Sequence, residues 1–425
     1  MKVIRKVELL AIGDELLNGQ RANSHLLYFG EKLQEIGLGL QRCTELRDEP
    51  AEIVEGLKRA IDGSDLILVT GGLGPTTDDY TVGCVASALE RPVRRNPEVE
   101  AAIRAFFKER GKEPTENNFK QCDIVDGAEV LPNPNGTAPG QWIELNDQVI
   151  VLLPGPPLEM KPMFEDQVLP RLVDKGWALS PVNSVQIRTM GIGESKVAEM
   201  LAPLLKGSGS KLRVAYCAHL GYVDVRLSPV EGGWDEARIR TMGEACRERL
   251  GEGFLGYGTP EVAAVILQHL RGLNKSLAVA ESCTGGLLAS RFTDVPGASK
   301  IFMGGVVCYR NQVKENLLGV PDCILEQHGA VSAECAVAMA TAVAELLESD
   351  YALSITGYAG PEGGNEPAGT IYLGYHSPVG VWSRKVVLPG NRTAVRERAV
   401  MTALDFIRRK LEKYKIYDLL ESLKC

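Results

Sequence analysis

The chain has 425 residues, 44% of them hydrophobic and 24% charged, which is too long for one ordinary core and predicts a globular protein of two or three domains. Its 47 basic and 55 acidic side chains give a formal net charge of −8, so nothing in the charge balance favours a nucleic-acid-binding surface. There is no signal-peptide pattern and no apolar run of the roughly 20 residues that span a bilayer, so we expect a cytoplasmic protein with no membrane contact. The ten cysteines include no C-x-x-C pair, so we expect neither a disulfide framework nor a structural zinc site.

Residues 1–175 alternate short apolar strands with amphipathic helices. Strands are expected at 7–12, 65–70 and 148–153, and helices at 24–36, 79–89 and 158–172. Alternation of this kind is typical of a doubly wound, largely parallel sheet. The first region is therefore predicted to be one α/β domain.

Residues 176–256 have a different pattern, that of a small α+β module. The expected elements are a strand at 184–190, a helix at 194–205, two strands within 213–227 and a helix at 235–250. The four glycines within 251–259 predict a linker to the next domain.

Residues 257–415 return to strand–helix alternation and are predicted to form a second α/β domain. The expected elements are a helix at 260–271, strands at 276–280, 301–309 and 351–356, a helix at 332–347, two further strands and a terminal helix. Ser332 and Asn391 are the expected N-caps of the last two helices. The terminal helix is expected to end near 413, with residues 416–425 as a tail.

The strongest local signal in the first domain is T-G-G-L-G-P-T-T-D-D at 70–79, directly after an expected buried strand. Ligands bind at the carboxyl ends of parallel strands, and glycine turns allow backbone N–H groups to converge on an anion. The run is neither a Walker A loop nor a G-x-G-x-x-G turn, which argues against kinases and NAD-dependent dehydrogenases. The candidate contacts are Gly71, Gly72, Gly74, Pro75, Thr76 and Asp78. A helix cap is an equally good interpretation of Asp79.

Three more Gly/Pro-rich loops, at 13–19, 133–140 and 154–160, are expected at the same sheet edge. They add the candidate contacts Gly13, Asp14, Glu15, Asn133, Gly155 and Pro156. The four loops carry the motifs G-D-E-L-L-x-G, T-G-G-L-G-P-T-x-D-D, N-P-x-G-T-A-P-G and P-G-P-P-x-E-M. With these motifs, residues 5–170 resemble the molybdopterin-binding-like domain of the CinA (competence/damage-inducible) family. The resemblance implies an ADP-ribose pyrophosphatase that depends on a divalent metal (Mg²⁺, Co²⁺ or Mn²⁺), with K⁺ as a further candidate ion. It makes Asp14, Asp78 and Asp79 the candidate metal ligands.

In the last domain, Ser282 of A-E-S-C-T-G-G (280–286) follows an expected strand and precedes an expected helix. A sharp turn of this kind exposes a side chain at the sheet edge. No histidine lies in an obvious partner motif, and lysine is the usual alternative base. Lys314 opens the helix after the next strand, although a surface charge is the commoner role for such a lysine. Spacing alone does not choose Ser282 over Cys283, which is intrinsically the better nucleophile.

Residues 275–400 contain four motifs in order: A-E-S-C-T-G-G, G-G-V-V-x-Y-x-N-x-x-K, G-A-V-S-x-E and T-G-x-A-G-P-x-G-G. With these motifs the region resembles the nicotinamide mononucleotide deamidase domain of the same family and the stand-alone PncC enzymes. The resemblance implies cofactor-free hydrolysis of the nicotinamide amide, with Ser282 as nucleophile, Lys314 as base, and Tyr309 and Thr356 in the pocket. The implied substrate contacts are Glu281, Thr284, Gly285, Gly286, Gly357, Ala359, Gly360 and Arg392.

Two departures from that pattern stand out. Residues 366–369 read E-P-A-G where K-P-V-G is common, and Cys308 stands where serine is usual. The first removes a cationic contact and bears on substrate affinity.

In the middle module, M-G-I-G-E-S at 190–195 resembles the family's KH-like domain, but its few basic residues argue against RNA binding.

The sequence thus predicts a three-domain α/β protein that binds no nucleic acid. The resemblance implies that it acts on nicotinamide mononucleotide and ADP-ribose and forms a homodimer. Two alternatives stay open. One is a molybdopterin- or nucleotide-binding protein with a degenerate last domain, and the other is a non-enzymatic competence or DNA-damage accessory protein.

Overall fold

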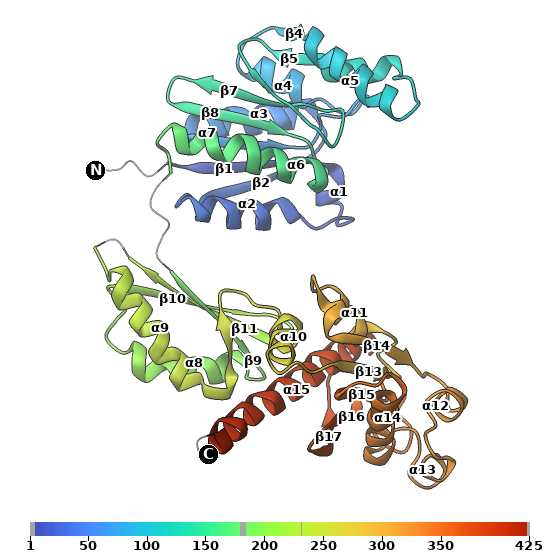
Figure 1. Ribbon diagram of the computed structural model, residues 1–425. Helices are drawn as coiled ribbons and strands as arrows, with labels where there is room; N and C mark the ends of the chain where they lie inside the picture. Colours follow the sequence, from blue (N-terminus) through green and yellow to red (C-terminus); the bar gives the residue numbers. More distant parts are fainter. Residues whose placement is uncertain (1–4, 179–183, 231, 423–425) are drawn as a thin grey trace. The chain divides into compact units, whose positions relative to one another are not determined.

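The computed structural model describes residues 5–178, 184–230 and 232–422, and the side chains of these residues up to 412. The chain divides into two compact units, residues 1–182 and 183–425 (Figure 1). In the described part, no helix is both long and apolar enough to cross a membrane.

The N-terminal unit is built on a six-stranded sheet of order β2-β1-β3-β8-β7-β6. The first four of these strands are parallel, and β7 and β6 are antiparallel additions. The strands of this unit are β1 Val7–Ile12, β2 Leu40–Leu46, β3 Leu66–Thr70, β4 Val93–Arg95, β5 Asp123–Val125, β6 Glu129–Leu131, β7 Gly140–Leu145 and β8 Gln148–Leu153. The helices are α1 Asp14–Leu17, α2 Ser24–Glu35, α3 Pro50–Gly63, α4 Thr81–Ala88, α5 Pro97–Glu109, η1 Glu116–Cys122, α6 Pro157–Met163, η2 Phe164–Val168 and α7 Leu169–Asp174.

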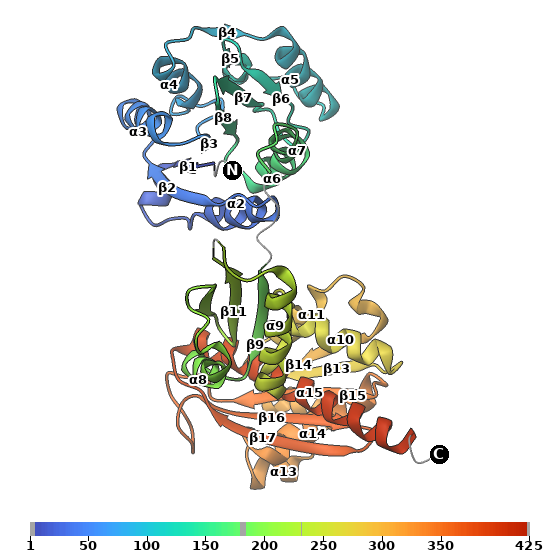
Figure 2. The same cartoon turned by 90° about the vertical axis from the view of Figure 1, so that its left-hand side faces the viewer.

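Helices cover both faces of this sheet, as a doubly wound sheet requires. Figure 2 shows α2, α6 and α7 on one face of the sheet and α3 and α4 on the other. On the first face, Phe29 and Leu33 of α2 and Phe164 of η2 are buried against β1, β3 and β8. On the second face, Leu57 of α3 and Val85 of α4 are buried. The helix expected at 158–172 is present but contains the π-helical segment η2. Since Pro170 has no N–H to donate, the regular α-helical hydrogen-bond pattern cannot continue through this stretch unchanged.

The C-terminal unit contains two sheets, a four-stranded sheet of order β10-β11-β9-β12 and a five-stranded sheet of order β14-β13-β15-β16-β17. Its strands are β9 Val185–Met190, β10 Leu212–Ala218, β11 Tyr222–Pro229, β12 Phe254–Tyr257, β13 Leu277–Glu281, β14 Phe302–Val307, β15 Tyr351–Gly357, β16 Thr370–Ser377 and β17 Gly380–Val387. Its helices are α8 Glu194–Leu205, α9 Glu236–Leu250, η3 Gly251–Gly253, α10 Val262–Gly272, α11 Leu287–Thr293, η4 Ala298–Lys300, α12 Asn311–Asn316, α13 Asp322–Gln327, α14 Ala333–Leu346 and α15 Arg392–Ser422.

The linker predicted at 251–259 is wrong. Residues Phe254–Tyr257 form β12, which pairs antiparallel with β9. Leu255 is buried in the adjoining core, and burial of such a side chain favours strand pairing over the flexibility that the four glycines suggested. The small module is thereby continuous with the last domain.

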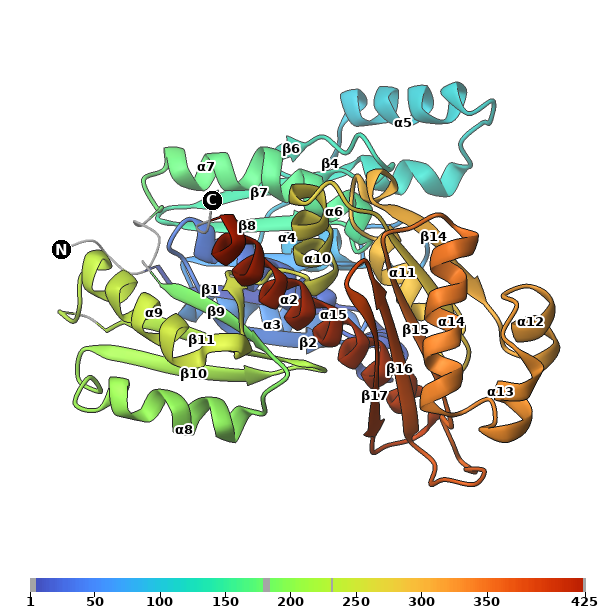
Figure 3. The ribbon, with the colours of Figure 1, turned by 60° about the horizontal axis from the view of Figure 1, so that its bottom comes forward.

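The five-stranded sheet positions the candidate catalytic residues. Its strands β14, β13 and β15 are parallel, so their carboxyl ends lie at one edge, while β16 and β17 are antiparallel. Helix α14 packs on one face, and α10, α11 and α15 contribute to the core on the other (Figure 3). Ser332 and Asn391 cap α14 and α15 as expected, each accepting a backbone N–H three residues on. Helix α15 continues to Ser422 rather than ending near 413. The predicted α/β class with largely parallel sheets is confirmed.

Candidate functional site

Ser282 is the first residue after β13, at the edge where three parallel strands end together. Its backbone N–H donates to the carbonyl oxygen of Ile355 in β15 at 2.9 Å, which fixes the start of the turn. Gly285 and Gly286 follow with φ of 64° and 98°, in the left-handed region that glycine adopts without steric cost. The side chain of Ser282 is only 8% exposed but contributes to the wall of a cavity.

Lys314 reaches Ser282 from α12, the helix that follows β14. Its Nζ donates to Ser282 Oγ at 3.1 Å, to the Cys308 carbonyl at 2.8 Å and to the Tyr309 carbonyl at 3.4 Å. With an exposed fraction of 1%, Lys314 is not the surface charge that its position in the sequence favoured. Burying a lysine is costly, so the close approach to a serine hydroxyl indicates a chemical rather than a solvent-exposed role.

Cys283 is in a different environment from its neighbour. Its side chain is buried in the core of the domain, and burial raises the pKa of its thiol to about 11. At neutral pH the thiol is therefore protonated, and the thiolate is the nucleophilic form. Lysine contact and thiol protonation both favour Ser282 as the nucleophile, a choice that spacing did not make.

A cavity of about 280 Å³ opens beside this pair. It is lined by Ser282, Cys283, Tyr309, Asn311, Lys314, Ala330, Val331, Thr356, Gly357, Tyr358, Ala359, Gly360, Glu362 and Arg392. The predicted residues Tyr309, Lys314, Thr356, Gly357, Ala359, Gly360 and Arg392 thus lie around one space with Ser282.

Hydrogen bonds hold the cavity walls in place. The hydroxyl of buried Thr356 donates to the Ala330 carbonyl at 2.6 Å and so ties β15 to the loop before α14. The exposed guanidinium of Arg392 donates to the Tyr309 hydroxyl at 3.0 Å and to the Gly360 carbonyl at 2.9 Å. Arg392 therefore joins two loops at the cavity mouth.

Four predicted substrate contacts, Glu281, Thr284, Gly285 and Gly286, do not line this cavity. The Glu281 carboxylate accepts the backbone N–H groups of Gly286, Leu288 and Ala289 at 2.8–3.1 Å and caps the start of α11. Arg396 donates to the Cys283 and Thr284 carbonyls at 3.1 and 2.8 Å. These residues shape the turn that presents Ser282, and their contact with substrate stays a prediction.

Several residues of the cavity wall were not among the predicted site residues. Asn311, Tyr358 and Glu362 line the cavity, as do Ala330 and Val331. All five lie inside the quoted motifs, so motif membership was the signal that could have found them. Tyr358 and Glu362 occupy the two variable positions of T-G-x-A-G-P-x-G-G.

The departure at residues 366–369 does not involve the cavity. The Glu366 carboxylate accepts the Tyr372 hydroxyl at 2.6 Å and pairs with Lys385 of β17 at 2.5 Å. Glu366 is not among the cavity residues. Glu366 therefore links its loop to Tyr372 and Lys385, and it adds no charge to the cavity wall.

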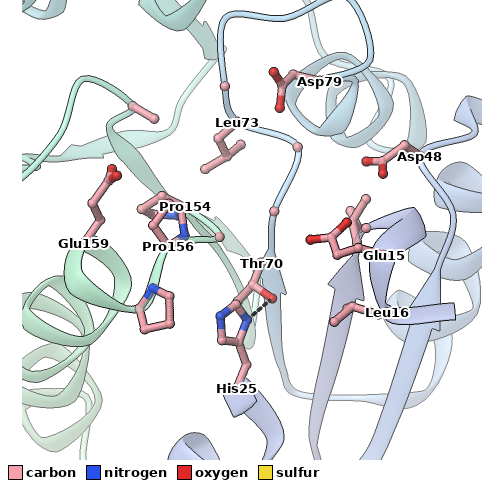
Figure 4. A pocket seen from close by; sticks show the side chains of 18 of the residues that line it. Glu15, Leu16, His25, Asp48, Thr70, Leu73, Asp79, Pro154, Pro156 and Glu159 are labelled. Atoms are coloured by element: carbon pink, nitrogen blue, oxygen red, sulfur yellow. Dashed lines mark hydrogen bonds between the residues drawn. The ribbon is translucent and has the colours of Figure 1, made fainter. Parts of the chain in front are cut away.

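A larger cavity, of about 620 Å³, lies in the N-terminal unit at the carboxyl ends of β1, β3 and β8 (Figure 4). Ten predicted residues line it, namely Gly13, Glu15, Gly71, Gly72, Gly74, Pro75, Asp78, Asp79, Gly155 and Pro156. Gly71 has φ 95°, and a Cβ there would lie 2.2 Å from the Ile12 carbonyl oxygen, so only glycine fits where β1 and β3 converge.

Three residues predicted for this cavity do not line it, namely Asp14, Thr76 and Asn133. Asp14 and Asp48 exchange backbone-to-carboxylate hydrogen bonds at 2.9 and 3.3 Å. The Thr76 hydroxyl bonds to Asp79, and Asn133 donates to the Ala138 carbonyl and Glu159 at 2.9 and 2.6 Å. All three hold loops of the cavity rather than facing it.

The predicted metal ligands do not form a metal centre. No group of three or more His, Cys, Asp or Glu side chains within the described ranges could hold a metal ion. Asp79 is engaged, since its Oδ2 accepts the Thr76 backbone N–H at 2.8 Å as a local cap would. Asp14, Asp78 and Asp79 are therefore not gathered into such a group, and their role as metal ligands stays a prediction.

His25 is a cavity residue that none of the quoted motifs contains. Its Nδ1 lies 3.0 Å from the Thr70 hydroxyl, and burial lowers the pKa of the imidazole. Figure 4 marks this hydrogen bond with a dashed line. Asp48 and Gln121 also line the cavity and lie outside all four quoted motifs. Only the tertiary structure could have found them.

Comparison with known proteins divides the chain into three parts. Family models match at residues 8–174 (probable molybdopterin binding domain), 184–256 (damage-inducible protein CinA KH domain) and 259–411 (CinA C-terminal domain). A "Putative competence-damage inducible protein" of Caldanaerobacter subterraneus subsp. tengcongensis is 43% identical over 413 residues, which cover 96% of this chain and 99% of the relative. A CinA-like protein of Dictyoglomus thermophilum is 38% identical over 410 residues, with the same two coverages.

Solved structures similar to this chain include a competence-damaged protein (CinA) superfamily protein from Escherichia coli. The match has 34% identity and covers 35% of this chain and 87% of the other, with a TM-score of 0.34.

Proposed function

The chain belongs to the CinA family, and on that premise we propose that its C-terminal domain hydrolyses the amide of nicotinamide mononucleotide to nicotinate mononucleotide and ammonia. The observation that carries the proposal is the 3.1 Å contact between Lys314 Nζ and Ser282 Oγ at the wall of a cavity. A buried serine–lysine pair is a known arrangement for acyl transfer without histidine.

The proposed steps use protein groups and water. Lys314, as the free amine, takes the Ser282 proton while Oγ attacks the amide carbon, and it then returns a proton to the leaving nitrogen as ammonia departs. Water, deprotonated by Lys314, hydrolyses the resulting ester and restores the serine. The carbonyls of Cys308 and Tyr309 hold Nζ in place and stabilise its protonated form between steps.

Arg392 is the proposed contact for the nucleotide phosphate. It lies at the cavity mouth and is exposed, and its present acceptors are a hydroxyl and a carbonyl oxygen. Phosphate oxygens are stronger acceptors for a guanidinium than either of these. A bound phosphate would therefore replace the contacts with Tyr309 and Gly360.

The test is ammonia release from nicotinamide mononucleotide by the purified full chain, with and without a chelator. We expect release in both conditions, a loss of about a thousandfold or more in Ser282→Ala, and a similar loss in Lys314→Met. The exposed residues Ser290 and Lys300 supply matched controls, and Ser290→Ala and Lys300→Met should retain activity. Intact substrate after incubation with the folded wild-type chain would rule out the deamidase.

We propose further that the N-terminal cavity takes the pyrophosphate of ADP-ribose. The supporting observation is a 620 Å³ space lined by the glycine turn at Gly71–Gly74. The Gly71 N–H donates to the Leu153 carbonyl at 3.2 Å, so it is the later N–H groups of the turn that can face an anion. Because the described carboxylates form no metal cluster, we assign no step to a divalent ion or to K⁺. ADP-ribose incubated with Mg²⁺, Co²⁺ or Mn²⁺ tests the proposal. Cleavage that survives Asp78→Ala would remove that residue from the site, and no cleavage with any ion would contradict the activity.

A further inference from the structure

Three charged side chains line the cavity at Ser282, and two of them are already engaged. Lys314 bonds to the Ser282 hydroxyl and two carbonyls, and Arg392 bonds to a hydroxyl and a carbonyl. Glu362 has no ion pair and no hydrogen bond to any residue that the structure describes. The cavity wall therefore carries one unpaired negative charge.

The position of Glu362 in the chain places it toward the mouth of the cavity. It lies in the loop after β15, two residues beyond Gly360, whose carbonyl Arg392 holds. Ser282, Lys314 and Thr356 are buried, whereas Glu362 and Arg392 are exposed. A ligand with its amide at Ser282 and its phosphate at Arg392 would therefore share the cavity with the Glu362 carboxylate.

We propose that Glu362 is a specificity-determining residue, whose carboxylate selects the positively charged pyridinium ring of the substrate while Arg392 takes the phosphate. The inference rests on the proposed deamidase function. It adds that the site distinguishes ligands by the charge of their pyridine ring. An N-substituted pyridinium is cationic at every pH, whereas its reduced dihydropyridine form is neutral. Attraction at an exposed site is modest, so we expect discrimination of about three- to tenfold.

The experiment measures binding without turnover, by calorimetry on the full-length Ser282→Ala chain. Oxidised and reduced nicotinamide mononucleotide are compared before and after adding Glu362→Gln. We expect the Kd of the oxidised ligand to rise about three- to tenfold and that of the reduced ligand to change less than twofold. The effect on the oxidised ligand should shrink in high salt, because the carboxylate is exposed.

A matched control and a conservative variant show whether charge is responsible. Glu326→Gln, an exposed glutamate of α13 outside the cavity, should leave both Kd values unchanged. Glu362→Asp should retain part of the preference for the oxidised ligand. Thermal unfolding of each variant checks that the fold is intact.

Three results for Glu362→Gln would each overturn the inference. The Kd values of both ligands could rise equally, neither Kd could change, or the Kd of the oxidised ligand could fall. No measurable binding of either ligand by the folded chain would overturn it as well. Ammonia release by the wild type is measured separately. Release with unchanged selectivity in Glu362→Gln contradicts the inference alone, whereas selective binding without release contradicts the deamidase alone.

Discussion

The side chains of Ser282 and Cys283 leave the same turn and meet different surroundings. Ser282 Oγ faces Lys314 Nζ, while the Cys283 thiol is buried in the core under α11 and α15. Burial keeps the thiol protonated at neutral pH, and the protonated thiol is a weaker nucleophile than the thiolate. The environment of each residue therefore favours Ser282 over a neighbour that the sequence leaves equivalent.

Cys283→Ala should keep ammonia release within about threefold of wild type, because the thiol that it removes carries a pKa of about 11. Loss of the buried sulfur should cost about 1 kcal/mol of stability, which denaturant unfolding would measure. Loss of activity as severe as that of Ser282→Ala, with the fold intact, would assign the nucleophile to Cys283.

Asp48 gives a pH-dependent prediction for the N-terminal unit. Burial, together with the nearby carboxylates of Asp14 and Glu15, raises the pKa of Asp48. A raised folded pKa means that the native state binds more protons than the unfolded state, so this group's contribution to stability falls as pH rises through the folded pKa. Asp48→Asn should therefore stabilise the unit at pH 7, by about 0.5 kcal/mol after allowance for solvent screening, and the gain should disappear at pH 3. Unfolding curves at several pH values test this, and a gain that persists at pH 3 would contradict the electrostatic cause.

At the scale of elements, Glu281 stabilises the start of helix α11, although its place directly before Ser282 suggested a contact with the substrate. Helix α11 has seven residues and begins after Gly286, which has no side chain to cap it. Three of the N–H groups at this helix start bond to the Glu281 carboxylate from the end of β13. The negative charge also matches the positive end of the helix dipole.

Glu281→Gln should destabilise the C-terminal unit by about 1–3 kcal/mol, since one amide oxygen cannot accept three N–H groups and the charge is lost. We also expect lower ammonia release, with kcat falling more than KM rises, because the same turn presents Ser282. Glu345→Gln, an exposed position on α14, is the matched control for stability. Unchanged unfolding of Glu281→Gln would show that the cap contributes little.

At the scale of the molecule, α15 joins the two sheets of the C-terminal unit. Arg408 is fully buried and donates to Asp405 at 2.6 Å, to Glu412 at 2.8 Å and to the Glu252 carbonyl at 2.7 Å. Glu252 lies in η3, two residues before the start of β12. The helix that packs on the five-stranded sheet thus also holds the edge of the four-stranded sheet.

Arg408→Ala should cost about 3–5 kcal/mol, because it leaves the buried Asp405 carboxylate without one of its two arginine partners and creates a cavity. Denaturant unfolding measures the loss, and hydrogen exchange of the β12 amides should be faster than in the wild type. The control is Arg384→Ala, at an exposed position of β17. Unchanged exchange in β12 would contradict the coupling of the two sheets through α15.

The sequence by itself determined the local elements. Strands β1 and β8 and helix α8 have the predicted bounds, because hydrophobic periodicity and turn residues act within a few positions. Glycine-rich turns also identified the edges of both sheets, since few other residues fit such backbone conformations. The pairing of Ser282 with Lys314 came from the family resemblance and not from spacing.

Only the tertiary structure decided which side chains meet. Ser282 and Lys314 are 32 residues apart, and they touch because β14 and β13 are neighbours in the sheet. The same long-range packing buries Cys283, directs Glu281 to a helix start and keeps Asp14 out of the N-terminal cavity. It also makes β12 from a glycine-rich segment. These outcomes depend on strand order and on contacts between distant segments, for which a single sequence carries no local signal.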